Sequence, residues 1–111
     1  MTDHELNQLT ENILGCAFQV SNTLGCGFLE KVYENSLAHE LRKHGLDVIQ
    51  QAPIEVHYAQ VVVGEYFADL LVSDAVIVEL KAVRGINEAH TAQCLNYLKA
   101  TGLPICLLLN F

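Results

Sequence analysis

Two apolar runs rich in β-branched residues lie only a few positions apart in this chain, at Phe67–Val72 and Val76–Lys81. Runs of this length and composition, separated by a short polar segment, predict two buried strands joined by a tight turn. Three charged residues, Asp69, Glu79 and Lys81, nevertheless lie inside them. Charged side chains are rarely buried unless they are paired or coordinate a metal ion. The three charges therefore require a common explanation, and we favour a divalent-metal site.

The length of the turn decides whether the two carboxylates face each other. A two-residue loop of Ser73-Asp74 would place Asp69 opposite Val78 and leave Glu79 on the other face of the sheet. A three-residue loop that adds Ala75 would place Asp69 opposite Glu79. A metal site therefore predicts the second register.

The chemistry of such a site is simple. Mg²⁺ prefers oxygen ligands and keeps several waters, so two carboxylates and a backbone carbonyl are sufficient to hold it against a substrate phosphate. Glu79 and Lys81 are two residues apart and share one face of a strand, and a lysine there can orient or help deprotonate an attacking water. The structural alternative is that Asp69 caps a turn or pairs with Arg84, while Glu79 and Lys81 form a charge ladder on an edge strand.

The remaining elements follow from hydrophobic periodicity and turn residues. Helical spacing predicts helices over residues 3–23, 29–44 and 88–100. Strands are predicted over 47–58, 61–72, 75–83 and 103–111. We expect Pro53 to interrupt the first strand, Gly64 to mark a bulge in the second, and the last strand to be buried on both faces. The order α-α-β-β-β-α-β predicts an α/β fold with a mixed central sheet flanked by helices.

Three polar side chains on the helices are further candidates for the site. Glu30 begins the second helix and is expected to point toward the sheet, although a favourable charge on the helix dipole is the simpler role. Gln93 and Tyr97 lie one turn apart on the third helix, opposite Leu95 and Leu98. If these leucines pack on the core, Gln93 and Tyr97 flank an open cleft; an ordinary solvated face fits the spacing equally well.

The formal net charge of −7 limits the classes of partner. Tight, metal-free binding of duplex nucleic acid draws on a basic surface, and this chain has only six lysines and arginines. Bound divalent ions would add positive charge where a phosphate must lie, so a metal-dependent enzyme is less affected.

The compartment is expected to be the cytoplasm. No apolar run approaches the roughly 20 residues that span a bilayer, and the residues after Met1 contain neither a basic start nor an apolar signal core. The four cysteines lack the spacing of a zinc site, so we expect reduced thiols. No membrane partner is expected.

Four segments of the chain together resemble a known family. They are Gly27–Tyr33, Gly64–Asp69, Val78–Ala82 and Gln93–Gly102. In order and content they look like the GxxExxY proteins, small prokaryotic members of the PD-(D/E)XK nuclease superfamily. The resemblance covers nearly the whole chain and implies one restriction-endonuclease-like domain over residues 1–111.

The resemblance also implies roles for particular residues. Asp69 and Glu79 correspond to the metal ligands and Lys81 to the catalytic lysine, while Ala68 replaces the proline of the superfamily name. Glu30 corresponds to the first-helix carboxylate that completes the metal cluster. The QxxxY element of related exonucleases corresponds to Gln93 and Tyr97.

The sequence thus predicts a nuclease that uses Mg²⁺ or Mn²⁺ to hydrolyse phosphodiester bonds in DNA, or alternatively in RNA. A second hypothesis is a non-catalytic interaction module that retains the fold, with the first helix and last strand burying a homo-oligomer interface. A glycosidase-like carboxylate pair is disfavoured, because Lys81 would lie two residues from a carboxyl that must stay protonated.

Overall fold

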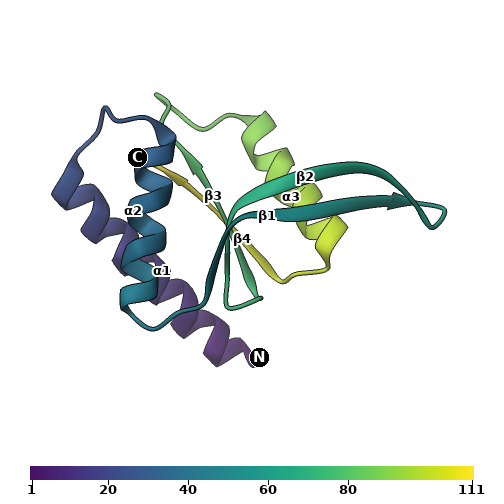
Figure 1. The fold of residues 1–111 in the computed structure, drawn as a ribbon, viewed down its shortest axis with the longest axis horizontal. Helices are drawn as coiled ribbons and strands as arrows, with labels where there is room; N and C mark the ends of the chain where they lie inside the picture. Colours follow the sequence, from purple (N-terminus) through teal and green to yellow (C-terminus); the bar gives the residue numbers. More distant parts are fainter.

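Three helices cover both faces of a four-stranded sheet in the computed structural model, which describes residues 1–111 (Figure 1). The elements are α1 (Asp3–Leu24), α2 (Glu30–Lys43), β1 (Val48–Tyr58), β2 (Val61–Val72), β3 (Val76–Lys81), α3 (Glu88–Thr101) and β4 (Ile105–Asn110). Helices α1 and α2 pack on one face and α3 packs on the other. The predicted element order and α/β class are confirmed.

The strands lie in the order β1-β2-β3-β4, with β1–β2 and β2–β3 antiparallel and β3–β4 parallel. Helix α3 provides the crossover that a parallel connection requires, so the sheet is mixed, as predicted. Strand β3 is central and buried, whereas residues 105–109 of β4 are only half-buried. The prediction that the last strand is buried on both faces is wrong, because β4 lies at an edge of the sheet.

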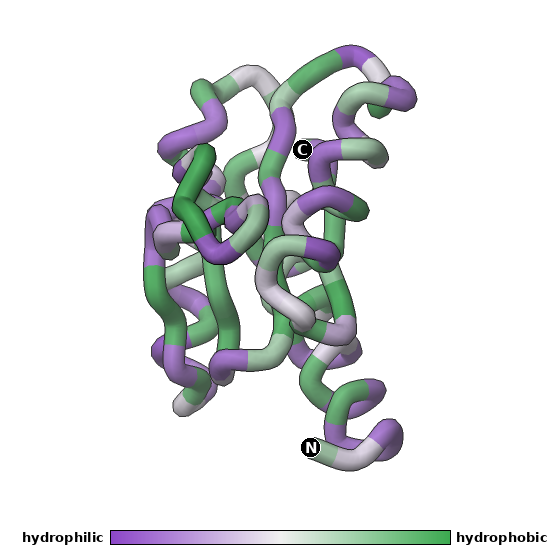
Figure 2. Tube along the Cα trace, turned by 90° about the vertical axis from the view of Figure 1, so that its right-hand side faces the viewer, coloured by the Kyte–Doolittle hydropathy of each residue, from purple (hydrophilic) through white to green (hydrophobic).

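The larger core lies between the sheet and the pair α1 and α2. The trace is hydrophobic over long stretches of the strands and changes between hydrophobic and hydrophilic along the helices (Figure 2). Tyr33 of α2 is fully buried there, and its ring stacks on Phe111 with centroids 4.7 Å apart. Its hydroxyl donates to the Gly25 carbonyl oxygen at 2.6 Å. These contacts fix the start of α2 beside the sheet.

A smaller core lies beneath α3 and contains Ala52, Ile54, Ala68, Ile77 and Tyr97. Even-numbered residues of β1 and β2 face this core near residues 52 and 68, whereas the even-numbered Val48 and Leu70 face the larger core. The change occurs at Gln51, which leaves the pairing ladder with φ at 53°, a costly conformation for a non-glycine residue. The predicted break at Pro53 is wrong: β1 runs through this proline, which an edge strand tolerates.

The bulge predicted near Gly64 is confirmed one residue earlier. Val63 is the extra residue between the pairs Val56–Gly64 and His57–Val62. A bulge bends a strand and increases its twist. The outer part of the β1–β2 hairpin consequently projects beyond the helices (Figure 1).

Candidate active site

The register of β2 and β3 brings the two carboxylates together. Val72 pairs with Val76 and Leu70 pairs with Val78, so a three-residue loop, residues 73–75, joins the strands. The next position along each strand is Asp69 on β2 and Glu79 on β3. The register that a metal site requires is therefore the one found.

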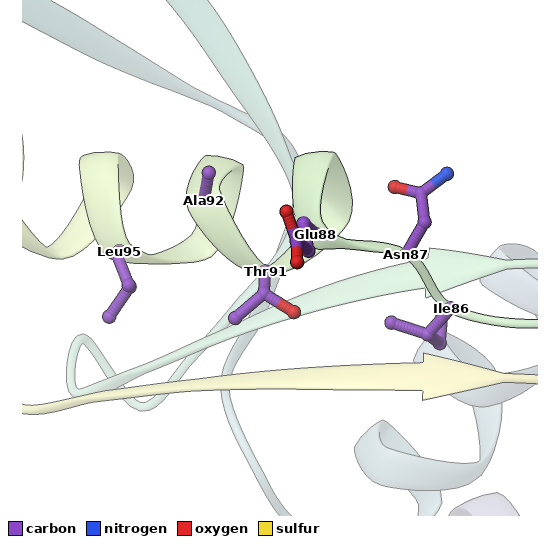
Figure 3. Close-up of a pocket in the computed structure, with 6 residues that line it drawn as sticks. All are labelled: Ile86, Asn87, Glu88, Thr91, Ala92 and Leu95. Carbon is purple, nitrogen blue, oxygen red and sulfur yellow. The ribbon is translucent and has the colours of Figure 1, made fainter.

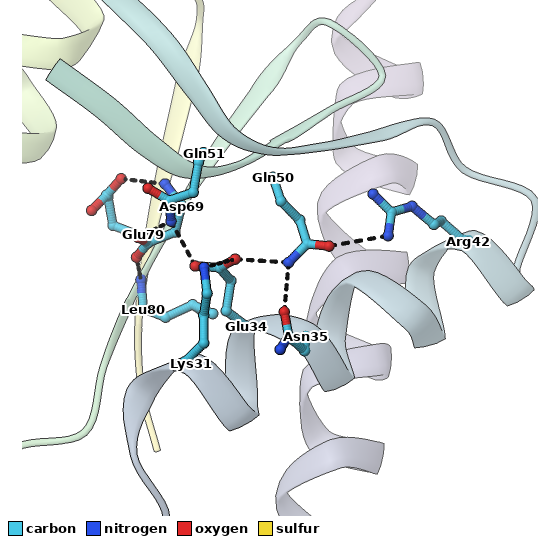
Figure 4. Close-up of polar contacts among 9 residues, drawn as sticks. All are labelled: Lys31, Glu34, Asn35, Arg42, Gln50, Gln51, Asp69, Glu79 and Leu80. Carbon is cyan, nitrogen blue, oxygen red and sulfur yellow. Dashed lines mark hydrogen bonds and ion pairs between the residues drawn. The ribbon is translucent and has the colours of Figure 1, made fainter. Parts of the chain in front are cut away.

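Beyond Leu70, hydrogen bonds from backbone to side chain replace the backbone–backbone hydrogen bonds between β2 and β3 (Figure 4). The Asp69 backbone N–H donates to Glu79 Oε1 at 3.0 Å, and the Leu80 backbone N–H donates to Asp69 Oδ2 at 2.8 Å. Each carboxylate thus binds the backbone of the neighbouring strand, and regular pairing ends at Leu70. We call Asp69 and Glu79 the crossed carboxylate pair.

Burial makes this pair electrostatically unusual. Glu79 is only 3% exposed. Burial, and then the charge of Asp69, raise the pKa of the Glu79 carboxyl to about 7, although the Asp69 N–H and the Lys81 charge act in the opposite direction. Burial also raises the pKa of Asp69. A bound cation would stabilise the ionised form of both groups.

Lys81 lies one strand repeat beyond Glu79, at the half-buried end of β3. Its charge lowers the pKa of both Asp69 and Glu79. The edge-ladder alternative is wrong, because β3 is central and not an edge strand. Nor does Asp69 pair with Arg84: its side chain binds Leu80 and Gln51 instead.

A third buried carboxylate, Glu34, supports Asp69 and was missed from the sequence. Glu34 is 4% exposed and accepts hydrogen bonds from Gln51 Nε2 at 2.6 Å, Gln50 Nε2 at 2.7 Å and Lys31 Nζ at 3.0 Å. Gln51 Nε2 also donates to Asp69 Oδ1 at 3.3 Å (Figure 4). Gln51 therefore lies opposite Asp69 with a left-handed backbone, and its side-chain amide lies between the carboxylates of Glu34 and Asp69.

A signal for Glu34 existed in the sequence. Glu34, Ala38 and Leu41 have the i, i+4, i+7 spacing of a buried helical stripe, and all three are buried. The apolar Tyr33, Leu37 and Leu41 mark the same core-facing side of the helix, and Glu34 lies next to Tyr33 on it. No local pattern indicates that Gln51 adopts a positive φ.

Glu30 differs from the expectation. It is the first residue of α2 and is exposed, so the prediction that it points toward the sheet and away from water is wrong. Its charge nevertheless raises the pKa of Glu79. No group of three or more Asp, Glu, His or Cys side chains has the arrangement of a metal site, so Glu30 does not join the crossed carboxylate pair directly.

Gln93 and Tyr97 interact on α3, where Gln93 Nε2 donates to the Tyr97 hydroxyl at 3.0 Å. Tyr97 is buried in the smaller core. Burial, and then the charge of Glu79, raise the pKa of Tyr97 to about 12, so its hydroxyl keeps its proton at neutral pH. Tyr97 therefore lies within the electrostatic reach of the crossed carboxylate pair.

The orientation of α3 is not the one we expected. Leu95 is 56% exposed and lines a shallow depression with Ile86 and Thr91 (Figure 3). Cys94 and Tyr97 are instead the buried residues of this helix. Gln93 and Tyr97 still line a groove, because the β1–β2 hairpin forms its other wall.

The residues present fit a hard divalent cation. Carboxylate oxygens from adjacent strands are the donors that Mg²⁺ and Mn²⁺ accept, and Mg²⁺ commonly uses one or two carboxylates and completes its shell with water and substrate phosphate. Burial is the main cause that raises the pKa of Asp69 and of Glu79, and the charge of Lys81 only partly offsets it.

Comparison with known proteins assigns the family. Residues 7–111 match the model of the PD-(D/E)XK nuclease superfamily. The chain belongs to this superfamily. No curated protein and no solved structure is significantly similar to it. PD-(D/E)XK nucleases typically use divalent metals, and the α/β arrangement found here is compatible with their restriction-endonuclease-like fold. None of the three helices combines the length and apolarity needed to span a bilayer.

Proposed function

We propose that this chain is a Mg²⁺- or Mn²⁺-dependent nuclease of the GxxExxY type, acting on DNA or RNA through one domain over residues 1–111. The observation that carries the proposal is the crossed carboxylate pair, with Lys81 two residues beyond Glu79, in a member of the PD-(D/E)XK superfamily. The cytoplasm is the proposed compartment.

Asp69 and Glu79 would hold the metal ion, which supplies Lewis-acid activation of the phosphate and of water. Gln51, held by Glu34, limits the rotation of the Asp69 carboxylate by donating to Oδ1. Pre-set ligand orientation of this kind supports metal affinity. Glu30 is exposed but electrostatically close to Glu79, so it is assigned to the water shell of the ion.

Lys81 would orient the attacking water and balance the negative charge that accumulates on the phosphoryl oxygens. In hydrolysis, a water oxygen bonds to phosphorus, the bond from phosphorus to the leaving oxygen breaks, and the proton lost by the water balances the proton gained by the leaving group. Tyr97 remains protonated and can donate to a phosphate oxygen, while Gln93 fixes its hydroxyl.

The test is a cleavage assay with Mg²⁺ or Mn²⁺ on single-stranded DNA, duplex DNA and RNA. We expect Lys81→Ala to lower the cleavage rate at least about 100-fold, because one preorganised electrostatic contact contributes that much. Lys43→Ala is the matched control, since Lys43 is highly exposed and forms a single ion pair, with Glu40. Equal cleavage by wild type and Lys81→Ala, with both folded, would assign the activity to a contaminant.

A non-catalytic interaction module is the second candidate function. It is favoured by the half-buried apolar edge strand β4 and by the exposed Phe18 beside it, which together suit a homo-oligomer interface. A protein that neither cleaves any of the three substrates nor binds Mn²⁺ would fit this candidate.

A further inference from the structure

A groove with a volume of about 890 Å³ runs between α3 and the outer part of the β1–β2 hairpin. Tyr97 and Gln93 lie in its lining, so the groove is continuous with the candidate active site. Figure 1 shows the hairpin crossing α3 at this position. We call this surface the hairpin groove. It is lined by hairpin residues 56–57, 63–64 and 66 and by α3 residues 89, 92, 93, 96, 97, 99 and 100.

The charge of the hairpin groove differs from that of the whole chain. The chain has 13 acidic residues, yet none of them lines this groove. Lys99 does line it, and this lysine is exposed and forms no ion pair. His57 also lines it, with Glu55 Oε2 at 3.4 Å from its Nε2. A groove free of carboxylates in an acidic protein is suited to a ligand with negative charge.

Tyr66 provides an aromatic surface inside the same groove. Its side chain is 51% exposed, and its ring lies 5.9 Å from the Tyr97 ring, centroid to centroid, at an angle of 51°. A half-exposed tyrosine that is supported from behind by a buried ring can stack on a nucleobase. Such stacking accepts every base, since every base has a π-face.

Small residues keep the hairpin groove open around this tyrosine. A Cβ atom at Gly64 would lie 3.8 Å from Tyr66 Cε2, in ordinary contact with the ring, so the glycine leaves this side of the ring uncovered. Ala89 and Ala92 line the helix wall and are exposed. The amide of Asn96 adds hydrogen-bonding capacity on the same wall.

We propose that the hairpin groove binds a segment of single-stranded nucleic acid, with a base stacked on Tyr66 and a phosphate beside Lys99. The claim that the groove leads this strand to Asp69 and Glu79 rests on the proposed nuclease function. The claim that the groove binds the strand does not. A single strand is favoured over a duplex for two reasons. Unpaired bases expose the faces that Tyr66 can stack on, and the single lysine in the groove lining is too little for the backbone contacts that duplex binding draws on.

The test measures fluorescence anisotropy of a labelled oligothymidylate, an oligouridylate and a duplex of equal length, at low salt. The protein carries Lys81→Ala and Mg²⁺ is present, so that cleavage does not consume the probe. We expect both single strands to bind more tightly than the duplex, and Tyr66→Ala to weaken their binding roughly ten-fold or more. Tyr66→Phe keeps the ring and is expected to bind nearly as well as the parent protein.

Tyr58→Ala is the matched control, because Tyr58 is a more exposed tyrosine at the end of the same hairpin and outside the groove. Ala92→Phe is a second probe: it fills the groove from an exposed helix position and should reduce binding without loss of fold. Unchanged single-strand binding in folded Tyr66→Ala and Ala92→Phe, equal duplex binding, or no single-strand binding would overturn the proposal.

The two proposals fail differently. Tyr66-dependent binding by a wild-type protein that cleaves nothing would remove the nuclease function and leave the hairpin groove as a binding site. Metal-dependent cleavage by a protein whose single-strand binding is unaffected by Tyr66→Ala would retain the nuclease and remove the groove as a binding site.

Discussion

At the scale of single residues, burying the crossed carboxylate pair disfavours its ionisation, yet the ionised pair is what can bind a cation. Asp69 and Glu79 satisfy backbone N–H groups that the diverging strands leave unpaired, yet their mutual repulsion and burial oppose ionisation. A neutral Glu79 stabilises the fold without metal, and an ionised Glu79 is the form that binds a cation. Metal binding and metal-free stability therefore make opposite demands on the same side chain.

This opposition has a consequence for pH. The pKa of the Glu79 carboxyl is about 7 in the folded protein, above its ordinary value of 4.5, so its stabilising contribution is complete below about pH 4.5 and is lost as pH rises through 7. Without metal, we expect the wild type to lose up to about 3 kcal/mol of unfolding free energy over this range relative to Glu79→Gln.

Urea denaturation in a chelating buffer at acidic and alkaline pH measures this difference. Because Glu79→Gln keeps the shape of the side chain and removes the titration, it isolates the contribution of Glu79 from that of other groups. A wild type and a Glu79→Gln variant with parallel pH profiles would show that Glu79 ionises as freely in the folded state as in the unfolded state.

At the scale of elements, the irregular point of β1 positions the site. Gln51 adopts a left-handed backbone, changes the face on which the neighbouring residues pack, and places its amide between Glu34 and Asp69. Strained backbone of this type is maintained only where surrounding contacts compensate for it. Here those contacts include the hydrogen bonds from the Gln51 side chain.

Two substitutions separate backbone from side chain at this position. Gln51→Gly removes the side chain and relieves the strain, whereas Gln51→Ala removes the side chain and keeps the strain. We expect Gln51→Ala to be less stable than Gln51→Gly by about 1 kcal/mol in chemical denaturation. Both should lose metal affinity to a similar degree, since neither holds Asp69. Equal stabilities would contradict a strained Gln51.

How far the sequence predicts these elements depends on the range of the contacts involved. Helical spacing predicted every helix and apolar runs predicted every strand. The need to bring Asp69 and Glu79 together predicted the register of the turn between their strands. Contacts between distant segments were less accessible. The burial of Glu34 depends on two glutamines of β1, and the exposure of Leu95 depends on which side of α3 the hairpin covers.

At the scale of the whole molecule, the net charge of −7 makes the ion essential to the proposed function. Lys31 pairs with Glu34 and Lys43 pairs with Glu40, so only part of the small basic complement is free to meet phosphate. Attraction of a nucleic acid must therefore come from the bound cation and from the carboxylate-free hairpin groove.

The central claim is that the crossed carboxylate pair is a metal centre, and calorimetric titration with Mn²⁺ at slightly alkaline pH tests it most directly. We expect the wild type to bind Mn²⁺, Glu79→Gln to bind it at least about ten-fold more weakly, and Lys81→Ala to bind it no more weakly than the wild type, because Lys81 adds a positive charge but no ligand. No heat of binding in the wild type, or equal affinity in Glu79→Gln, would contradict the assignment.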